Sequence, residues 1–343
     1  RAAGGGIAAT ELAGAPAAAM PLGAIVIGTG AGATAITKIT QRNNRSIGLQ
    51  VGYDVATIGA LLGLIAVRVN SLVVLLVGTT LIGVGNSAVM LSRYALADLG
   101  PAQQRARTIG RSLLVVAAGS ILGPLLLGPA GRAAELIAMP ALSGTYAAAA
   151  GAFALAAIVL VVGRTGQRGS GRILTNTTEP ARPPHQPSDP TVRSIGQALW
   201  VLATANLTMV TMMAVYPSHL HHTGHSLGLT SIIVSAHVGS MFAASSMLGR
   251  WTDLHGAKRV ATLGAATTAT SCVLTATLPT DDARVAALAL VVLGVGWNAQ
   301  LIAGSALLTA HTRSEGRRAQ LESHGEIVMS AAAAAGALVL APM

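Results

Sequence analysis

The chain alternates between long apolar stretches and short polar segments that carry its charges. One stretch without charged residues lies between Glu11 and Lys38. Others cover residues 69–92, 112–131, 136–163, 260–280 and 285–312. A bilayer core of about 30 Å is crossed by roughly 20 apolar residues in a helix. Each stretch therefore predicts a membrane-spanning helix.

Four further spans have weaker patterns. Residues 194–249 contain no Lys, Arg, Asp or Glu but are interrupted near the middle by Pro217 and by polar residues up to Gly224. This pattern predicts two spans joined by a short polar loop. A ninth span, at about residues 47–68, is interrupted only by Asp54, and a tenth covers about residues 324–342. We therefore expect an all-α membrane protein with ten helices.

Composition agrees with this interpretation and excludes several classes of protein. Hydrophobic residues make up 52% of the 343 residues and charged residues 10%, whereas a soluble domain carries about 25% charged residues. A single cysteine, Cys272, excludes a disulfide framework or a thiolate metal cluster within one chain. No Gly-Lys-Ser or Gly-Lys-Thr phosphate loop is present, which argues against ATP hydrolysis.

The net charge of +10 follows from membrane orientation. Seventeen of the 22 basic residues lie in every second connection between the predicted spans. Short cytoplasmic loops are enriched in Lys and Arg, so these connections are predicted to be cytoplasmic and the first span to run inward. The charge therefore reports topology, and we do not expect nucleic-acid binding.

A polar linker divides the spans five and five. Residues 164–193 are rich in Arg, Gly, Ser, Thr and Pro, a composition typical of a flexible cytoplasmic linker. We thus expect an N-terminal transmembrane half at 1–163 and a C-terminal transmembrane half at 194–343. The chain begins with Arg1 rather than methionine. One more helix at each end would give six and six, the layout of two parallel repeats, so we expect that the first and last helices of the fold are missing.

The segment 249–259 carries the first motif. Its pattern resembles the loop Gly-x-x-x-Asp-(Arg/Lys)-x-Gly-(Arg/Lys)-(Arg/Lys) of the major facilitator superfamily, with one inserted residue and Leu254 in place of a basic residue. The matching residues are Gly249, Asp253, Gly256, Lys258 and Arg259. A glycine permits close helix approach, and a carboxylate can pair with a helix N-terminus. The resemblance implies a gating loop; the alternative, retention of cytoplasmic positive charge, explains only the two basic residues.

The corresponding loop of the other half, residues 37–46, has lost part of this pattern. Gln41 stands where the family has aspartate, and Asn44 where it has glycine. Asparagine tolerates a left-handed backbone, so the turn is expected to survive. Glutamine supplies no charge, which leaves Asp253 as the better gating candidate.

A second resemblance, in the fourth predicted span, is to the drug:proton antiporter branch of the superfamily. Its fifth-helix pattern Gly-x8-Gly-x3-Gly-Pro-x2-Gly-Gly is matched except at Leu127. The matching residues include Gly110, Gly119, Gly123 and Pro124. The resemblance implies a bent helix that seals the cavity from one side; the alternative is ordinary packing of small residues. In the preceding span this branch carries an arginine where the chain has Thr79, which weakens proton transfer at that position.

Polar residues near the centres of the spans are costly and therefore informative. We expect five of them to share a substrate cavity: Asn86, Asn206, His237, Trp297 and Asn298. Each has the alternative of a helix-packing role. The proton-coupling candidates are Asp54, His237 and Glu326. Arg93, Asp98 and Arg105 are predicted to form a structural charge network.

The outer loop contains His219, His221, His222 and His225, a spacing that can bind zinc or nickel. Because no Cys, Asp or Glu accompanies them, we expect a solvated loop and no metal site. No cofactor is predicted.

These observations predict a secondary active transporter of small molecules, with proton-coupled efflux by alternating access, and not an enzyme. The expected partners are the lipid bilayer, a small-molecule substrate and protons, with the chain a monomer in the plasma membrane, here a bacterial inner membrane. Two alternatives stay open: a non-transporting sensor or scaffold on a transporter fold, and a membrane-embedded enzyme. The enzyme class is disfavoured because the adjacent carboxylates Asp281 and Asp282 lie in an outer loop.

Overall fold

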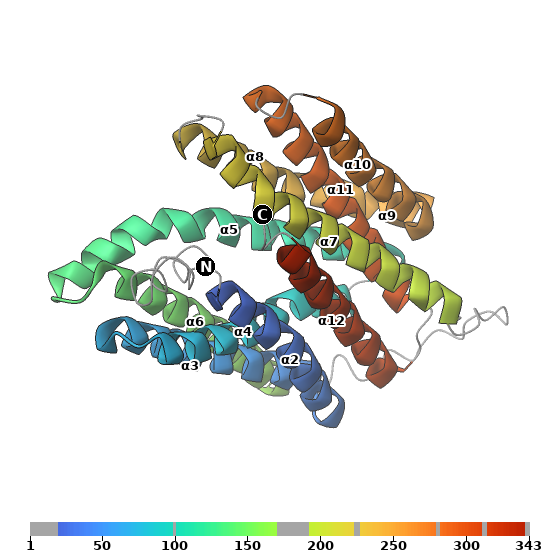
Figure 1. Cartoon of the computed structure of the whole chain (residues 1–343). Helices are drawn as coiled ribbons and strands as arrows, with labels where there is room; N and C mark the ends of the chain where they lie inside the picture. The colour runs from blue at the N-terminus through green and yellow to red at the C-terminus, as the bar shows by residue number, and fades with distance from the viewer. Residues whose placement is uncertain are drawn as a thin grey trace. The chain divides into compact units, whose positions relative to one another are not determined.

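The computed structural model describes residues 20–98, 101–169, 192–222, 227–278, 282–310 and 314–339. Within these ranges the chain consists of helices, with no β-strand (Figure 1). The α-helices are α2 (Met20–Arg42), α3 (Arg45–Val69), α4 (Leu72–Asp98), α5 (Arg105–Leu136), α6 (Ala141–Gly169), α7 (Val192–His222), α8 (Leu227–Ala243), α9 (Ser245–His255), α10 (Ala257–Thr277), α11 (Ala283–Thr309) and α12 (Glu315–Val339). A short 3₁₀ helix, η2 (Ala102–Gln104), precedes α5. The predicted fold class is confirmed.

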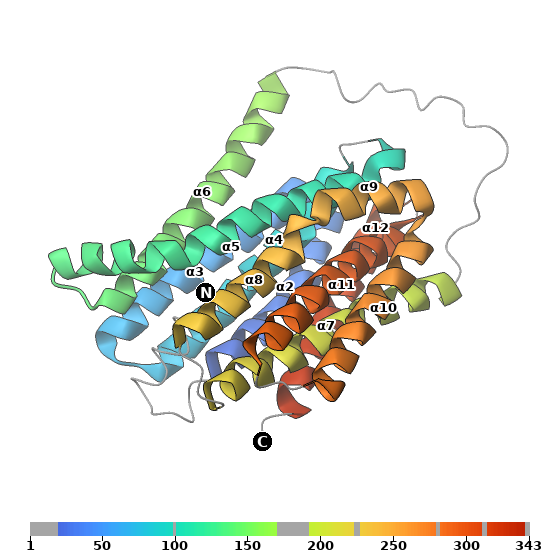
Figure 2. The same cartoon turned by 90° about the horizontal axis from the view of Figure 1, so that it is seen from above.

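Each of the ten predicted spans coincides with a helix, the seventh with α8 and α9 together (Figure 2). Seven helical segments in the described ranges are long and apolar enough to cross a membrane. Helices α2, α5 and α12 are not among these seven. Their membrane crossing therefore stays a prediction.

The helix ends follow the local sequence. The Asn44 side chain accepts a hydrogen bond from the Ile47 amide at 2.8 Å and so caps the N-terminus of α3. Its φ of −160° is extended, so the expectation of a left-handed turn at Asn44 is wrong. Gly256, with φ of +88°, separates α9 from α10 in a conformation that favours glycine.

Two loops are shorter in the structure than the sequence predicts. Most of the segment 249–259 is helical, because α9 extends to His255 and α10 begins at Ala257. The polar interruption after Pro217 also lies in helix as far as His222, where α7 ends. Part of the predicted linker is helical too, since α6 continues to Gly169. Residues 170–191 lie outside the described ranges.

The contacts divide the chain into two compact units. Unit 1 comprises Arg1–Met90, Leu125–Arg193 and Ala310–Ser323, and unit 2 comprises Leu91–Pro124, Ser194–Thr309 and His324–Met343. Helices α4, α5 and α12 therefore each contribute residues to both units. This division differs from the boundaries 1–163, 164–193 and 194–343, which stay a prediction about the two halves.

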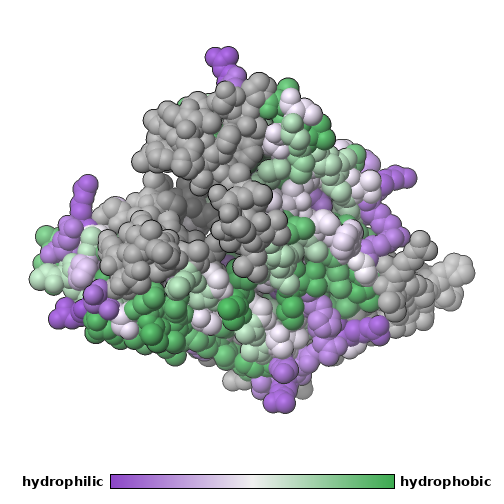
Figure 3. Space-filling model, in the orientation of Figure 1, coloured by the Kyte–Doolittle hydropathy of each residue, from purple (hydrophilic) through white to green (hydrophobic). Residues whose placement is uncertain are grey.

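Each unit has its own apolar core. In unit 1, α3 packs on α6, and Phe153 and Tyr146 fill the space beside Gly63 and Gly85. In unit 2, α11 packs on α8 and α10, with Leu290 and Leu293 buried. Apolar side chains also cover wide areas of the described surface, as Figure 3 shows. That distribution is typical of helices that face lipid.

Candidate functional site

In unit 2, helix α9 meets the beginning of α5 at a junction that brings two predicted motifs together. We call it the α5–α9 junction and define it by Gly110, Gly249 and Asp253. The Asp253 carboxylate accepts hydrogen bonds from the backbone amides of Ala106 at 3.0 Å and Arg107 at 2.9 Å. Both amides belong to the first turn of α5, where helix N–H groups have no intrahelical partner. A carboxylate at this position also interacts favourably with the positive end of the helix dipole.

The two glycines of the junction permit this approach. A Cβ atom on Gly110 would overlap the carbonyl oxygen of Ser245, and a Cβ on Gly249 would lie 2.5 Å from the carbonyl oxygen of Ala106. Both obstacles are backbone atoms, which a side chain cannot displace without moving a helix. The predicted close helix approach is thus present at Gly110 and Gly249.

The other motif residues differ in their surroundings. Lys258 and Arg259 are exposed in the first turn of α10. Gly119 is exposed, and nothing lies within 4 Å of a Cβ placed there. Gly123 and Pro124 lie within α5, which continues as a helix through both. The role of these five residues stays a prediction.

A fully buried ion pair lies elsewhere in unit 2. Arg93 of α4 donates to the Glu326 carboxylate of α12 at 2.6 Å, and both side chains are at most 3% exposed. Arg93 also donates to the Tyr94 hydroxyl at 3.1 Å, which in turn donates to the Ser305 hydroxyl of α11 at 3.1 Å. Removing one member of such a pair leaves an uncompensated buried charge, at a cost of about 3–5 kcal/mol.

The predicted network of Arg93, Asp98 and Arg105 is therefore divided. Arg105 forms an ion pair with Asp98 at 2.8 Å and donates to the Thr309 hydroxyl of α11 at 3.1 Å. Arg93 pairs instead with Glu326, four residues beyond Glu322 on α12.

The predicted cavity residues form four separate hydrogen-bonded groups, two of which contain more than one polar side chain of unit 2. Trp297 donates to the Asn206 side chain at 3.0 Å, and Asn206 donates to the carbonyl of Met329 at 2.9 Å. Asn298, which is fully buried, exchanges hydrogen bonds with Ser245. These contacts link α7, α9, α11 and α12 within unit 2.

His237 and Asn86 form the other two groups. The Nδ1 atom of His237 lies 2.7 Å from the carbonyl oxygen of Leu290, in a site where His237 is 1% exposed. Asn86 lies in unit 1, where it donates to the Thr29 hydroxyl at 3.3 Å. A shared cavity of all five residues stays a prediction.

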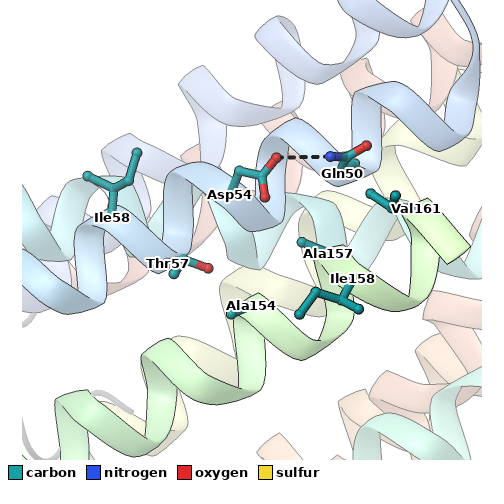
Figure 4. Close-up of a pocket in the computed structure, with 8 residues that line it drawn as sticks. All are labelled: Gln50, Asp54, Thr57, Ile58, Ala154, Ala157, Ile158 and Val161. Atoms are coloured by element: carbon teal, nitrogen blue, oxygen red, sulfur yellow. Dashed lines mark hydrogen bonds between the residues drawn. The ribbon is translucent and has the colours of Figure 1, made fainter.

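Asp54 lies in a groove between α3 and α6 in unit 1, together with Gln50, Thr57 and Ile158 (Figure 4). It accepts a hydrogen bond from the Gln50 side chain at 3.3 Å and is exposed. The four clustered histidines fall on residues whose side chains, or in the case of His225 the whole residue, lie outside the described part of the chain. The described residues contain no group of three or more His, Cys, Asp or Glu that could hold a metal ion.

Comparison with known proteins identifies the fold. The family model described as Major Facilitator Superfamily matches residues 198–342. The uncharacterised MFS-type transporter YdeG of Bacillus subtilis (strain 168) is 28% identical over 329 residues, covering 93% of this chain and 75% of that protein. These findings support the major facilitator superfamily.

Solved structures of transporters share the fold. The E. coli fucose:proton symporter FucP superposes with a TM-score of 0.65 at 14% identity, covering 98% of this chain and 84% of FucP. The human organic anion transporter MFSD10 (TETRAN) superposes with a TM-score of 0.67 at 16% identity, covering 98% of this chain and 82% of MFSD10. At 14% and 16% identity, these likenesses show the fold.

The segment 37–46, predicted to correspond to segment 249–259 of the other half, also contributes a contact. In unit 1, the Gln41 side chain donates to the carbonyl of Gly316 at 2.9 Å, and we call this contact the α2–α12 junction. Beside it, Arg45 forms an ion pair with Glu322, which is 2% exposed. Sequence reasoning missed Glu322 and the role of Arg45. The available signal was the spacing of two glutamates, Glu322 and Glu326, which puts both on one face if the helix begins before the predicted span.

Proposed function

We propose that the chain is a secondary active transporter that exports small molecules in exchange for protons by alternating access. Membrane transport is supported by the relatives and by the fold; the direction and the coupling ion are our inference. The proposed location is the plasma membrane, with the protein acting as a monomer.

The observation that carries the coupling proposal is the buried pair of Arg93 and Glu326. Among the three proton-coupling candidates, Glu326 alone is a carboxylate held against a buried cation. Protonation of Glu326 would remove the charge that compensates Arg93, so the buried arginine would become costly. The arrangement that brings α4, α11 and α12 together at this site would then lose stability. A proton would thereby shift the equilibrium toward an arrangement in which Arg93 reaches water.

The contacts of Asp253 support the second part of the proposal, alternating access. Its carboxylate joins α9, in the predicted C-terminal half, to α5, in the predicted N-terminal half, within unit 2. Rocking of the two halves would break this contact in one state and form it in the other. Glu326 would then sense the proton, while Asp253 and the glycines would set the energy of one conformation.

The test is proton flux in proteoliposomes that contain a pH-sensitive dye. Candidate solutes are added on one side, with and without a pH gradient, to the unmodified chain and to Glu326→Gln. We expect solute-driven proton movement that Glu326→Gln abolishes, while exchange of solute for solute continues. Glu135→Gln is the matched control, because it removes an exposed carboxylate at the end of α5.

Two results would contradict the proposal. Full gradient dependence in Glu326→Gln would move proton coupling to Asp54 or His237. Absence of any gradient-sensitive flux would reject antiport and favour a sensor or scaffold on a transporter fold. That alternative has its own supporting observation: Gln41 and Thr79 replace charged residues of the family pattern, and Thr79 is 2% exposed with its hydroxyl bonded to the Leu75 carbonyl of its own helix.

A further inference from the structure

The groove between α3 and α6 presents a carboxylate on an otherwise apolar surface. Asp54 is exposed, and Gln50 is its one hydrogen-bond donor among the contacts of the described residues. The remaining walls are mostly alanine, isoleucine and valine side chains of the two helices. Figure 4 shows Asp54 and Gln50 on α3, with Ala157 and Ile158 on the facing helix α6.

Apolar side chains on both walls of this groove are exposed. Ile58, on the α3 wall, is 54% exposed, and Ile158, on the α6 wall, is 57% exposed. Leu61 and Ile65 continue the exposed apolar face along α3, and both helices belong to the set long and apolar enough to cross a membrane. The groove therefore opens toward lipid, where an unpaired carboxylate is costly and needs a cation or a proton.

The size and polarity of the groove define the ligand. Its volume is about 420 Å³, within the range of about 300–1,000 Å³ found for sites that hold one small molecule. The polar groups Gln50, Asp54 and Thr57 lie on one wall, and the opposite wall is apolar. A matching ligand carries one positive charge with N–H donors on an apolar body.

The position of Asp54 along α3 distinguishes between two sources of such a cation, a phospholipid headgroup and an amine without a phosphate. Asp54 lies nine residues after Arg45, the first residue of α3, which is about 13 Å along the helix at 1.5 Å per residue. The ammonium of an ethanolamine lipid is tied to a phosphate at the membrane surface. An amine attached directly to a hydrocarbon chain reaches this depth without burying a phosphate.

We propose that the α3–α6 groove is a binding site for a lipophilic primary amine dissolved in the membrane, with its ammonium on Asp54 and its chain along Ile58 and Ile158. The site lies apart from the Glu326 pair and from Asp253, and its occupation does not depend on whether the chain transports protons.

The test measures binding of radiolabelled dodecylamine to the full chain in phosphatidylcholine nanodiscs, with dodecanol as the neutral probe of equal length. We expect saturable binding of dodecylamine only. Asp54→Asn should weaken it at least tenfold, while Glu135→Gln should leave it unchanged. Ala154→Leu, which fills the groove without altering charge, should weaken it to a similar extent. This second variant keeps the test decisive if Asp54→Asn does not fold.

Three results would overturn the proposal. Equal binding of dodecylamine and dodecanol would mean that no cation is recognised. Unchanged affinity in both Asp54→Asn and Ala154→Leu would place the amine elsewhere. Competition by phosphatidylethanolamine in mixed nanodiscs would assign the groove to a lipid headgroup instead. None of these outcomes bears on the proton-flux test of Glu326.

Discussion

The α5–α9 and α2–α12 junctions each contain one of two predicted corresponding segments, 249–259 and 37–46, but they use opposite chemistry. At the α5–α9 junction, the Asp253 carboxylate accepts two hydrogen bonds from backbone amides at a helix N-terminus. At the α2–α12 junction, the Gln41 amide donates one hydrogen bond to the Gly316 carbonyl. One junction thus joins a negative charge to the positive end of a helix dipole, and the other is a neutral contact. We infer that the Asp253 contact stabilises its conformation more than the Gln41 contact does.

The N-terminal caps of α5 and α12 explain why one junction has a charged contact and the other a neutral one. The beginning of α12 has a local cap, because the Ser314 hydroxyl accepts from the Arg317 amide at 3.4 Å. At α5, the amides of Ala106 and Arg107 in the first turn donate to the Asp253 carboxylate. Helix α5 therefore receives its carboxylate cap from α9, a distant part of the sequence. Removing the Asp253 side chain should therefore destabilise the beginning of α5 more than removing the Gln41 side chain destabilises the beginning of α12.

The packing of the two junctions differs in the same direction. Gly249 faces backbone atoms of α5, whereas a Cβ atom on Gly316 would meet only the Ser314 hydroxyl, at 3.8 Å. The largest expected effect therefore comes from Gly249→Val, which should destabilise the protein by about 3 kcal/mol because the obstructing atoms belong to a helix backbone. The measurement is the unfolding free energy in mixed detergent micelles.

Gly316→Ala is the matched control for Gly249→Val, and we expect a change below about 0.5 kcal/mol. Equal destabilisation by the two variants would contradict the claim that only the α5–α9 junction is tightly packed. A tolerated valine at 249 would mean that α5 and α9 are free to separate.

Asp253→Asn should have an intermediate effect. Asparagine keeps one acceptor but loses the charge and one of the two hydrogen bonds, at a cost of about 1 kcal/mol. Because the contact biases the conformational equilibrium, turnover in proteoliposomes should fall more than the affinity for a transported solute. Unchanged turnover would remove Asp253 from the gating site, and a selective loss of affinity would make it a binding residue.

The fold could be predicted from the sequence because the pattern of apolar stretches is long-range and redundant. Ten charge-free or nearly charge-free segments coincide with helices, and capping residues such as Asn44 mark their ends. The predicted positions of the loops between the helices were less accurate. Polar residues near His222 and between Gly249 and His255 predicted loops, but helices tolerate polar residues wherever their backbone bonds are satisfied.

The site was predictable where one residue type carries the chemistry. Asp253 and Gly249 could be identified from a local motif, and their contact with α5 follows from the requirement for a helix cap. The partner of Glu326 could not be identified, because Arg93 is 233 residues away and local spacing contains no information on such a pair. Glu322 was missed for the same reason: its partner Arg45 looked like one of many cytoplasmic basic residues.

The smallest expected effect comes from substitution of Gln41, which tests the comparison of the two junctions at the α2–α12 junction. Gln41→Ala removes one hydrogen bond from an exposed neutral group, so we expect a loss of about 0.5 kcal/mol and almost unchanged turnover. Gln41→Asp restores the carboxylate of the family pattern but places it against the carbonyl of Gly316, beside a helix whose first turn Ser314 already caps. It should therefore be no more stable than Gln41→Ala. A gain of about 1 kcal/mol in Gln41→Asp would show that α12 accepts a remote carboxylate as α5 does, and the two junctions would then differ only in the residue at position 41.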